Sequence, residues 1–238
     1  MILITRPKKD ALIFANDLKV LNLATQIESV ISIRHRKPKI NIEKQNIFLV
    51  TSLYAVQALL SLGHKQIYQL KQKSFIVIGN RVAIELKKIG LKKIIFVSSD
   101  SDNLITKLKK NKKKINVNYI CSNNYNRELK TKLEGLNLSI ELTYAYSVIS
   151  KKKLSQKTSS LLQQRKIEIV TLYSKETAKV FFDLVRNAKI NKHKMESITF
   201  LCLSKSISNV VQLYKYHNTF HSKRPDKKSF LSLIKKTV

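Results

Sequence analysis

The sequence is poor in glycine, proline, tryptophan and acidic residues. Its 238 residues include four glycines, three prolines and no tryptophan, and 15 Asp and Glu stand against 46 Lys and Arg. Four glycines cannot supply the usual nucleotide cradles, and the chain has no P-loop, no Gly-x-Ser-x-Gly and no Gly-x-Gly-x-x-Gly motif. The few, scattered carboxylates argue against a two-metal or paired-carboxylate site.

Cysteine is also scarce. Cys121 and Cys202 each end an apolar run, NYIC and TFLC, so each is expected to be a buried thiol at a strand end. There is no CxxC motif and no His/Cys cluster, which argues against a zinc site. His217 and His221 have metal-pair spacing, but their segment is typical of a strand or loop. We therefore predict no metal.

Long apolar runs are missing as well. No run approaches the ~18 residues that a membrane-spanning helix needs. The opening residues, Met1-Ile-Leu-Ile-Thr-Arg-Pro, are interrupted too early by Arg6 and Pro7 to be a signal peptide. These features predict a cytoplasmic protein without a membrane partner.

What the chain has in excess is positive charge, with a net charge of +31. Most of it is lysine spread over nearly every segment, alongside abundant Asn and Ile, which resembles the composition that an A/T-rich bacterial genome imposes on unrelated proteins. Attraction to a polyanion is the alternative, and the two are compatible. The run Lys109–Lys114 is interpreted as a solvated loop, with nucleic-acid contact as its alternative.

Apolar strand-like runs alternate with segments of helical periodicity along the whole chain. The opening is a strand, a helix over 8–22 and a strand over Gln26–Ile33, and a later helix opens at Thr51-Ser52 and stops at Gly63. Such alternation predicts an α/β fold with mostly parallel sheets and helices on both faces. The expected strands include Ile2–Thr5, Asn46–Thr51, Phe75–Ile78, Ile94–Val97, Val117–Cys121, Glu168–Tyr173 and Ser197–Leu203.

Two extended stretches, Glu28–Arg36 and Glu141–Ser150, separate two sets of strand–turn–helix units. If the chain crosses between domains at these stretches, residues 1–34 and 149–238 form one discontinuous α/β domain and residues 35–148 an inserted one. In the second stretch Leu142, Tyr144 and Tyr146 fall on one side of the strand period. A tyrosine there is expected to face an interdomain cleft, a usual place for a ligand site.

Small polar residues follow the strands wherever a helix begins. In parallel α/β sheets that edge binds ligands, and free N–H groups at helix starts attract carboxylate or phosphate. Taken one at a time, these residues are better explained as helix caps; together they predict a site for a ligand with many anionic groups. The turns are Thr51-Ser52, Gly79-Asn80, Ser122-Asn123-Asn124, Ser174-Lys175 and Ser204-Lys205.

The order of these segments resembles the uroporphyrinogen-III synthase family. The resemblance runs through almost the whole chain. It rests on Thr5-Arg6-Pro7, LVTSLYAV (49–56), IGNRVAIEL (78–86), CSNNYNREL (121–129), ELTYAYSV (141–148), LYSKETAKVFF (172–182) and CLSKSISNVV (202–211).

This resemblance implies two α/β domains joined by a two-stranded β-ladder, no cofactor and no metal. The implied substrate is hydroxymethylbilane, a linear tetrapyrrole rich in carboxylates, which loses water, inverts ring D and closes to uroporphyrinogen III. Tyr146 matches the family tyrosine thought to assist departure of the ring-A hydroxyl; a packed aromatic residue is the alternative. Arg6 and Arg127, in the matched segments, join the turn residues as substrate-binding candidates, and we expect a monomer.

Two other functions stay open at this point. A basic α/β protein that binds RNA or DNA without catalysis would cluster Lys, Arg and aromatic residues on one face, whereas this sequence scatters them. A two-domain sugar- or phosphate-binding protein would share the cleft but would not need Tyr146.

Overall fold

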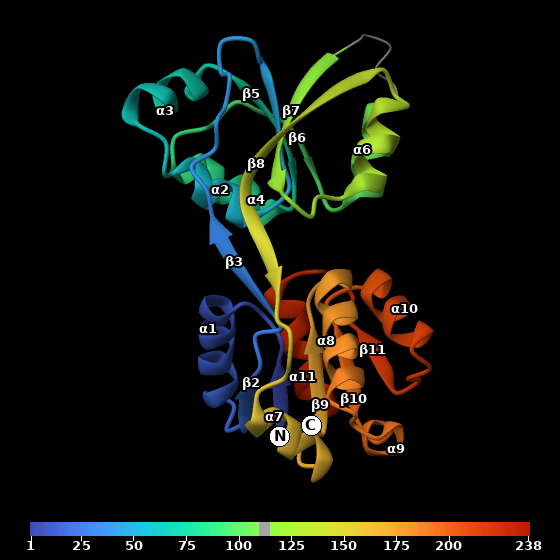
Figure 1. Cartoon of the computed structure of the whole chain (residues 1–238). Coiled ribbons are helices and arrows are strands. Elements are labelled where there is room, and N and C mark those ends of the chain that lie inside the picture. The colour runs from blue at the N-terminus through green and yellow to red at the C-terminus, as the bar shows by residue number, and fades with distance from the viewer. Residues whose placement is uncertain (110–114) are drawn as a thin grey trace. The chain divides into compact units, whose positions relative to one another are not determined.

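The computed structural model describes residues 1–109 and 115–238, so all of the predicted Lys109–Lys114 loop except Lys109 lies outside the described residues. By their internal contacts the residues fall into two compact units. Unit 1 comprises Met1–Ser32 and Ile149–Val238, and unit 2 comprises Ile33–Val148 (Figure 1). Whether these units are independently folding domains stays a prediction.

Unit 1 contains a five-stranded sheet in the order β11-β10-β9-β1-β2, in which every neighbouring pair is parallel. The first strand of the chain is therefore paired on both sides, by the second strand and by β9. The strands are β1 (Ile2–Ile4), β2 (Thr25–Ile27), β9 (Ile169–Leu172), β10 (Thr199–Cys202) and β11 (Thr219–His221). The helices are α1 (Lys8–Lys19), α7 (Gln156–Gln163), α8 (Lys175–Asn187), α9 (Lys192–Met195), α10 (Lys205–Leu213) and α11 (Lys227–Thr237).

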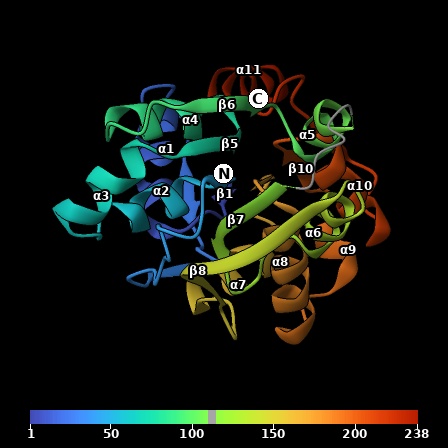
Figure 2. The same ribbon diagram turned by 90° about the horizontal axis from the view of Figure 1, so that it is seen from above.

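Unit 2 contains a six-stranded sheet in the order β3-β8-β7-β4-β5-β6, and the pairs from β8 to β6 are parallel. Figure 2 shows β6, β5, β7 and β8 following one another across this sheet. The strands are β3 (Ile31–His35), β4 (Ile47–Val50), β5 (Ser74–Ile78), β6 (Ile94–Ser98), β7 (Ile115–Ser122) and β8 (Leu138–Ser150). The helices are α2 (Leu53–Leu59), α3 (His64–Lys71), α4 (Asn80–Lys88), α5 (Ser101–Leu108) and α6 (Arg127–Glu134).

Both faces of the unit 2 sheet are buried. Successive residues along each strand point to opposite faces, and the residues of each face belong to a different apolar cluster. Phe48, Val50, Phe75 and Val77 pack with α2 and α4 on one face. On the other face Leu49, Ile76 and other strand residues pack with α5 and α6. Two-sided burial explains why the strands are continuous apolar runs rather than alternating ones.

The chain passes from unit 1 to unit 2 in β3 and returns in β8, and these two strands are neighbours. Within unit 2 the Arg36 N–H donates to the Ala145 carbonyl (2.9 Å), and within unit 1 the Lys151 N–H donates to the Val30 carbonyl (2.8 Å). The predicted fold class, two mostly parallel sheets with flanking helices, is confirmed. No helix in the described part of the chain has the length and apolar character to cross a bilayer.

Two local predictions are wrong. Gln26–Ile33 is not one strand, because β2 ends at Ile27 and β3 begins at Ile31. Gly63 does not stop the preceding helix, which ends at Leu59; it is the N-cap residue of α3, and its N–H donates to the Gln66 side chain at 3.4 Å. Gly63 has φ −68°, so the turn there does not exploit the conformational freedom of glycine.

Candidate functional site

Because the strands of each sheet are parallel, the turns that follow them share one edge of that sheet. In unit 2 this edge carries Thr51-Ser52 after β4, Gly79-Asn80 after β5 and Ser122–Asn124 at the end of β7. In unit 1 it carries Arg6 after β1, Ser174-Lys175 after β9 and Ser204-Lys205 after β10. The structure thus gathers the predicted binding residues into two sets, one at the carboxyl edge of each sheet.

The serines at these helix starts differ in how their hydroxyls are used. Ser52 accepts from the Tyr54 N–H (3.1 Å) and Ser174 from the Thr177 N–H (3.0 Å), so both are ordinary N-caps. Ser204 caps no backbone N–H among the described residues, and its hydroxyl lies 3.1 Å from that of Ser206. The capping explanation therefore accounts for Ser52 and Ser174 but leaves the Ser204 hydroxyl available to a ligand.

Asn123 has a structural task at its turn. Its N–H donates to the Tyr146 carbonyl (3.2 Å), and its side-chain oxygen accepts from the Val148 N–H (2.9 Å). The amide oxygen is thus occupied in tying this turn to β8. Asn124 and Arg127 are exposed beside it, and Asn126 caps α6 by accepting from the Leu129 N–H (3.0 Å). The two exposed side chains can reach a ligand at this turn.

Gly79 is needed for its backbone conformation. Its φ of 97° lies in the left-handed region that residues with a side chain rarely adopt. Its N–H donates to the Ser98 carbonyl (2.7 Å), which joins the end of β5 to β6. An added Cβ would lie 3.6 Å from the nearest Val82 methyl carbon, so backbone strain rather than lack of space requires glycine here.

Tyr146 lies at a register shift in β8. Cys121 pairs with Tyr144, but the next residue, Ser122, pairs with Tyr146, so β8 has one residue more than β7 at this point. The extra residue changes the alternation of faces. Tyr144 contacts Tyr125 (ring centroids 6.4 Å apart), which packs on the α6 side, whereas Tyr146 joins the cluster on the α2 side. The prediction that Tyr144 and Tyr146 share a face is therefore wrong.

The Tyr146 side chain is enclosed but not isolated. The residue is 7% exposed, its ring lies 5.7 Å from that of Tyr54, and the hydroxyls of Ser52 and Ser122 are close enough to its phenol to influence its pKa. Burial raises the pKa of the phenol above its usual value, and the two serine hydroxyls oppose this increase. The phenol therefore keeps its proton at neutral pH, and each serine can donate to the phenol oxygen.

A second tyrosine at this edge was missed by sequence reasoning. The Tyr119 hydroxyl lies 3.1 Å from that of Thr51, and burial raises the pKa of Tyr119 to about 12, opposed by the Thr51 hydrogen bond. The ring of Tyr119 meets that of Tyr125 edge to face at 6.5 Å. Tyr119 reads from the sequence as one apolar residue of a strand, and no sequence signal pairs it with Thr51.

Arg6, Lys175 and Lys205 give the unit 1 edge a positive character. Lys175 and Lys205 are exposed first residues of α8 and α10. The Arg6 guanidinium lies 4.5 Å above the ring of Tyr173, and one of its nitrogens is 3.9 Å from an Asp10 carboxylate oxygen. Three cations at the carboxyl ends of three adjacent strands favour an anionic ligand.

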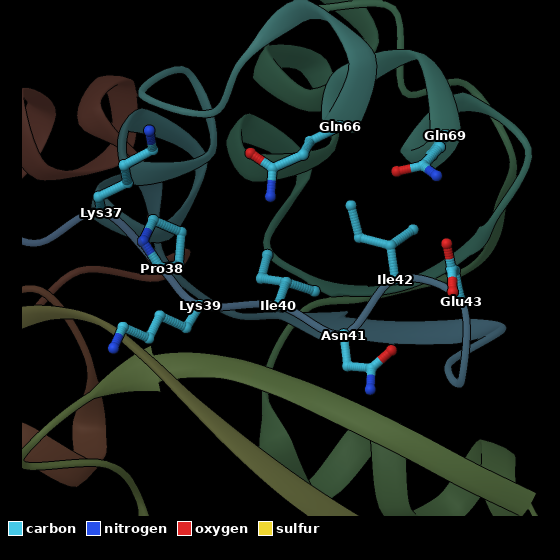
Figure 3. A pocket seen from close by; sticks show the side chains of 9 residues that line it. All are labelled: Lys37, Pro38, Lys39, Ile40, Asn41, Ile42, Glu43, Gln66 and Gln69. Carbon is cyan, nitrogen blue, oxygen red and sulfur yellow. The ribbon is translucent and has the colours of Figure 1, made fainter.

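A cavity of unit 2, shown in Figure 3, lies away from the strand-end turns. It has a volume of about 710 Å³ and is open to solvent. The segment 37–43, which precedes β4, lines it together with Gln66 and Gln69 of α3. None of the predicted binding residues lines this cavity, so it does not bear on the site at the strand ends.

The chemistry of the described residues shows no site for a metal. They contain no group of three or more His, Cys, Asp or Glu that could hold an ion. Cys121 and Cys202 are buried free thiols, as expected, and burial raises the pKa of each to about 12. Neither thiol is therefore a ready nucleophile at neutral pH.

Comparisons with known proteins agree on one family. The model of the family described as uroporphyrinogen-III synthase HemD matches residues 23–232. No curated protein matches the sequence.

Solved structures give the same fold. The crystal structure of uroporphyrinogen-III synthetase from Helicobacter pylori has a TM-score of 0.68 and 15% identity, and the match covers 100% of this chain and 99% of that one. A mutant uroporphyrinogen III synthase from Thermus thermophilus has a TM-score of 0.67 and 12% identity, covering 99% and 97%. The family match includes most of both units, and the chain belongs to the uroporphyrinogen-III synthase family.

Proposed function

We propose that this chain converts hydroxymethylbilane to uroporphyrinogen III, by loss of water, inversion of ring D and closure of the macrocycle. Family membership supports this reaction. The observation on the molecule that supports it best is the phenol of Tyr146, which is buried at the carboxyl edge of a parallel sheet beside the hydroxyl groups of Ser52 and Ser122.

Substrate binding is assigned to the strand-end turns. The substrate is a polycarboxylate, and helix starts present N–H groups and positive dipole ends to such ligands. In unit 2 the proposed contacts are Thr51, Ser52, Gly79, Asn80, Ser122, Asn123, Asn124 and Arg127. In unit 1 they are Arg6, Ser174, Lys175, Ser204 and Lys205. Many such contacts hold a flexible chain in one geometry, which is the main contribution that this reaction needs.

Tyr146 is proposed to assist the loss of water. The ring-A hydroxyl must take up a proton to leave as water, and a phenol O–H hydrogen-bonded to that oxygen stabilises the departing group. Ser52 and Ser122 can donate to the phenol oxygen, which leaves the phenol proton free to point at the substrate. Because the substrate also closes without help, although without inversion, this assistance is a modest part of the catalysis.

One assay tests the function. The full-length protein is mixed with freshly prepared hydroxymethylbilane, and the products are oxidised and separated into type III and type I isomers. We expect mainly type III, whereas the unaided reaction gives type I. A product mixture no richer in type III than a protein-free control would refute the proposed function.

A further inference from the structure

Tyr173, the residue that follows β9, holds a ring whose orientation is fixed by two phenylalanines. It meets Phe14 of α1 edge to face with centroids 5.6 Å apart, and Phe230 of α11 at 5.1 Å. Both phenylalanines are essentially fully buried. Edge-to-face contacts from two helices leave the ring little freedom to tilt, so any group on its open face is presented in a defined position.

The hydroxyl of Tyr173 does not explain why a tyrosine stands here. It is enclosed and makes no hydrogen bond that meets ordinary geometric limits within the described residues. Thr171, the hydroxyl residue close enough to influence it, donates instead to the Leu3 carbonyl (3.0 Å). The feature of Tyr173 with a visible contact is therefore its aromatic face.

That face carries Arg6. The central guanidinium carbon lies 4.5 Å from the ring centroid, within the range of a cation–π interaction. β1 and β9 pair in register with Ile4 opposite Thr171, so Arg6 and Tyr173 are each two residues beyond a matched pair. The Arg6 side chain is 23% exposed, and its nearest Asp10 oxygen, at 3.9 Å, is too distant for a good hydrogen bond. Arg6 therefore has one face on the ring and keeps donors for another anion.

We propose that Tyr173 is a positioning residue that holds the planar guanidinium of Arg6 at the unit 1 strand edge to bind a carboxylate of the substrate. This inference rests on the proposed function. A free arginine loses side-chain freedom when it binds, and a guanidinium already stacked on a fixed ring loses less of it. The planar fork of arginine also suits a carboxylate in two-point contact, which a lysine could not reproduce.

The alternative is that Tyr173 only fills the core of unit 1. Removing its ring would then lower stability without changing how an anion binds. The positioning role predicts instead that removing the ring weakens the binding of a polycarboxylate. It also predicts that this weakening occurs only when Arg6 is present. The two roles are separated by measuring binding and stability on the same variants.

The experiment uses the full chain and two readouts. The first is the Kd of uroporphyrin III, a fluorescent polycarboxylate probe, from its fluorescence anisotropy; the second is KM and kcat for hydroxymethylbilane. We expect Tyr173→Met to raise Kd and KM roughly three- to tenfold with kcat unchanged. Tyr173→Phe should bind like the natural protein, because it keeps the ring and loses only the unpaired hydroxyl. Tyr214→Met is the matched control, since its ring stacks on Phe182 at 4.4 Å and carries no cation in the described structure.

A double-mutant cycle makes the test specific. Arg6→Met should weaken binding more than Tyr173→Met, and the double variant should bind no worse than Arg6→Met alone. Additive losses would overturn the proposal, as would a Tyr173→Met variant that melts at a lower temperature but keeps its Kd. If Tyr173→Met fails to fold, Arg6→Lys provides the test. An Arg6→Lys variant that binds uroporphyrin III as tightly as the natural protein would refute the proposal that a stacked, planar guanidinium is needed.

The proposed function and this inference can fail separately. A natural protein that yields no type III product, yet binds uroporphyrin III through coupled Arg6 and Tyr173, would refute the function and support the positioning role. If the natural protein yields type III product but Tyr173→Met changes neither Kd nor KM, the proposed function is supported and the inference is overturned.

Discussion

Replacing Tyr146 by phenylalanine tests the proposed chemistry most directly, because it removes one oxygen and leaves the ring. The contact with Tyr54, at 5.7 Å between centroids, and the apolar packing of the ring should be kept. Ser52 retains its cap on the Tyr54 N–H, but the buried Ser122 loses the polar group beside it. Loss of one such polar interaction should lower the free energy of unfolding by about 1 kcal/mol.

The effect on turnover should be larger than the effect on folding. General-acid assistance is worth ~10²–10⁴-fold, and this leaving group departs readily, so we expect kcat to fall about 10²-fold or less. KM should change little, because the strand-end turns hold the carboxylates, and the product should remain mainly type III. Burial raises the pKa of Tyr146, so deprotonation of this phenol should not reduce the activity of the natural protein below pH ~10.

The matched control is Tyr144→Phe. Tyr144 is 45% exposed and, because of the register shift, packs toward Tyr125 rather than toward the serines. Initial rates, isomer ratios and thermal unfolding would be measured for both variants beside the natural protein. Equal activity of the two variants, or simple unfolding of Tyr146→Phe, would show that Tyr146 is structural.

Four further predictions concern stability, folding and charge. The buried Glu28 would have a raised pKa from burial alone, but hydrogen bonds from Lys151, Ser155 and Thr158 lower it below its usual 4.5. Glu28→Gln should therefore lower the free energy of unfolding by about 2 kcal/mol at neutral pH. In thermal melts the difference in stability between the natural protein and the variant should shrink as the pH falls through the lowered folded-state pKa, and a pH-independent difference would contradict this. In denaturant unfolding, Gly79→Ala should lower the free energy of unfolding by about 1–2 kcal/mol because φ is positive at Gly79, whereas Gly135→Ala, at φ −64°, should lower it much less. Equal losses of stability would show that backbone strain does not require glycine at position 79. Residues 33–148 expressed alone should unfold cooperatively by circular dichroism, and a non-cooperative melt would argue against an independent domain. Duplex DNA should bind weakly, with affinity that falls steeply with added salt in anisotropy titrations, and tight sequence-selective binding at physiological salt would refute this.

The strand–turn–helix pattern was predictable because its signals are local. In α8 the cap Ser174 and the buried Ala178, Phe181 and Val185 are all within one helix, so periodicity alone places it. The break between β2 and β3 was not predictable. β2 ends at Ile27, and the next residue, Glu28, is buried because Ser155 and Lys151, more than a hundred residues later, satisfy its carboxylate. A contact over that separation leaves no trace in the local pattern.

The candidate site was predictable as a set of turns but not in its detail. Ser52 and Gly79 follow apolar strands, and parallel pairing then places them on one edge. The register shift in β8 has no sequence signature, because the residues around Ala145 all favour strands, and one extra residue reverses the alternation that a regular strand would have. For the same reason the sequence identifies the strand but predicts, wrongly, that Tyr144 and Tyr146 share one face of it.

The pairing of β1 with β9 has a consequence for synthesis of the chain. In a nascent chain β1, α1 and β2 emerge well before β9, which follows only after residues 28–168 have been added. At ~5–20 residues per second this delay lasts roughly 7–28 s. During it, unit 2, which is continuous in sequence, is predicted to fold, whereas the apolar side chains of Phe14 and Leu18 still lack the strand and helix that bury them. A chain terminated before β9 should therefore leave the ribosome with unit 2 folded and with the apolar residues of α1 exposed. Premature termination is thus expected to lead to aggregation or to binding by chaperones.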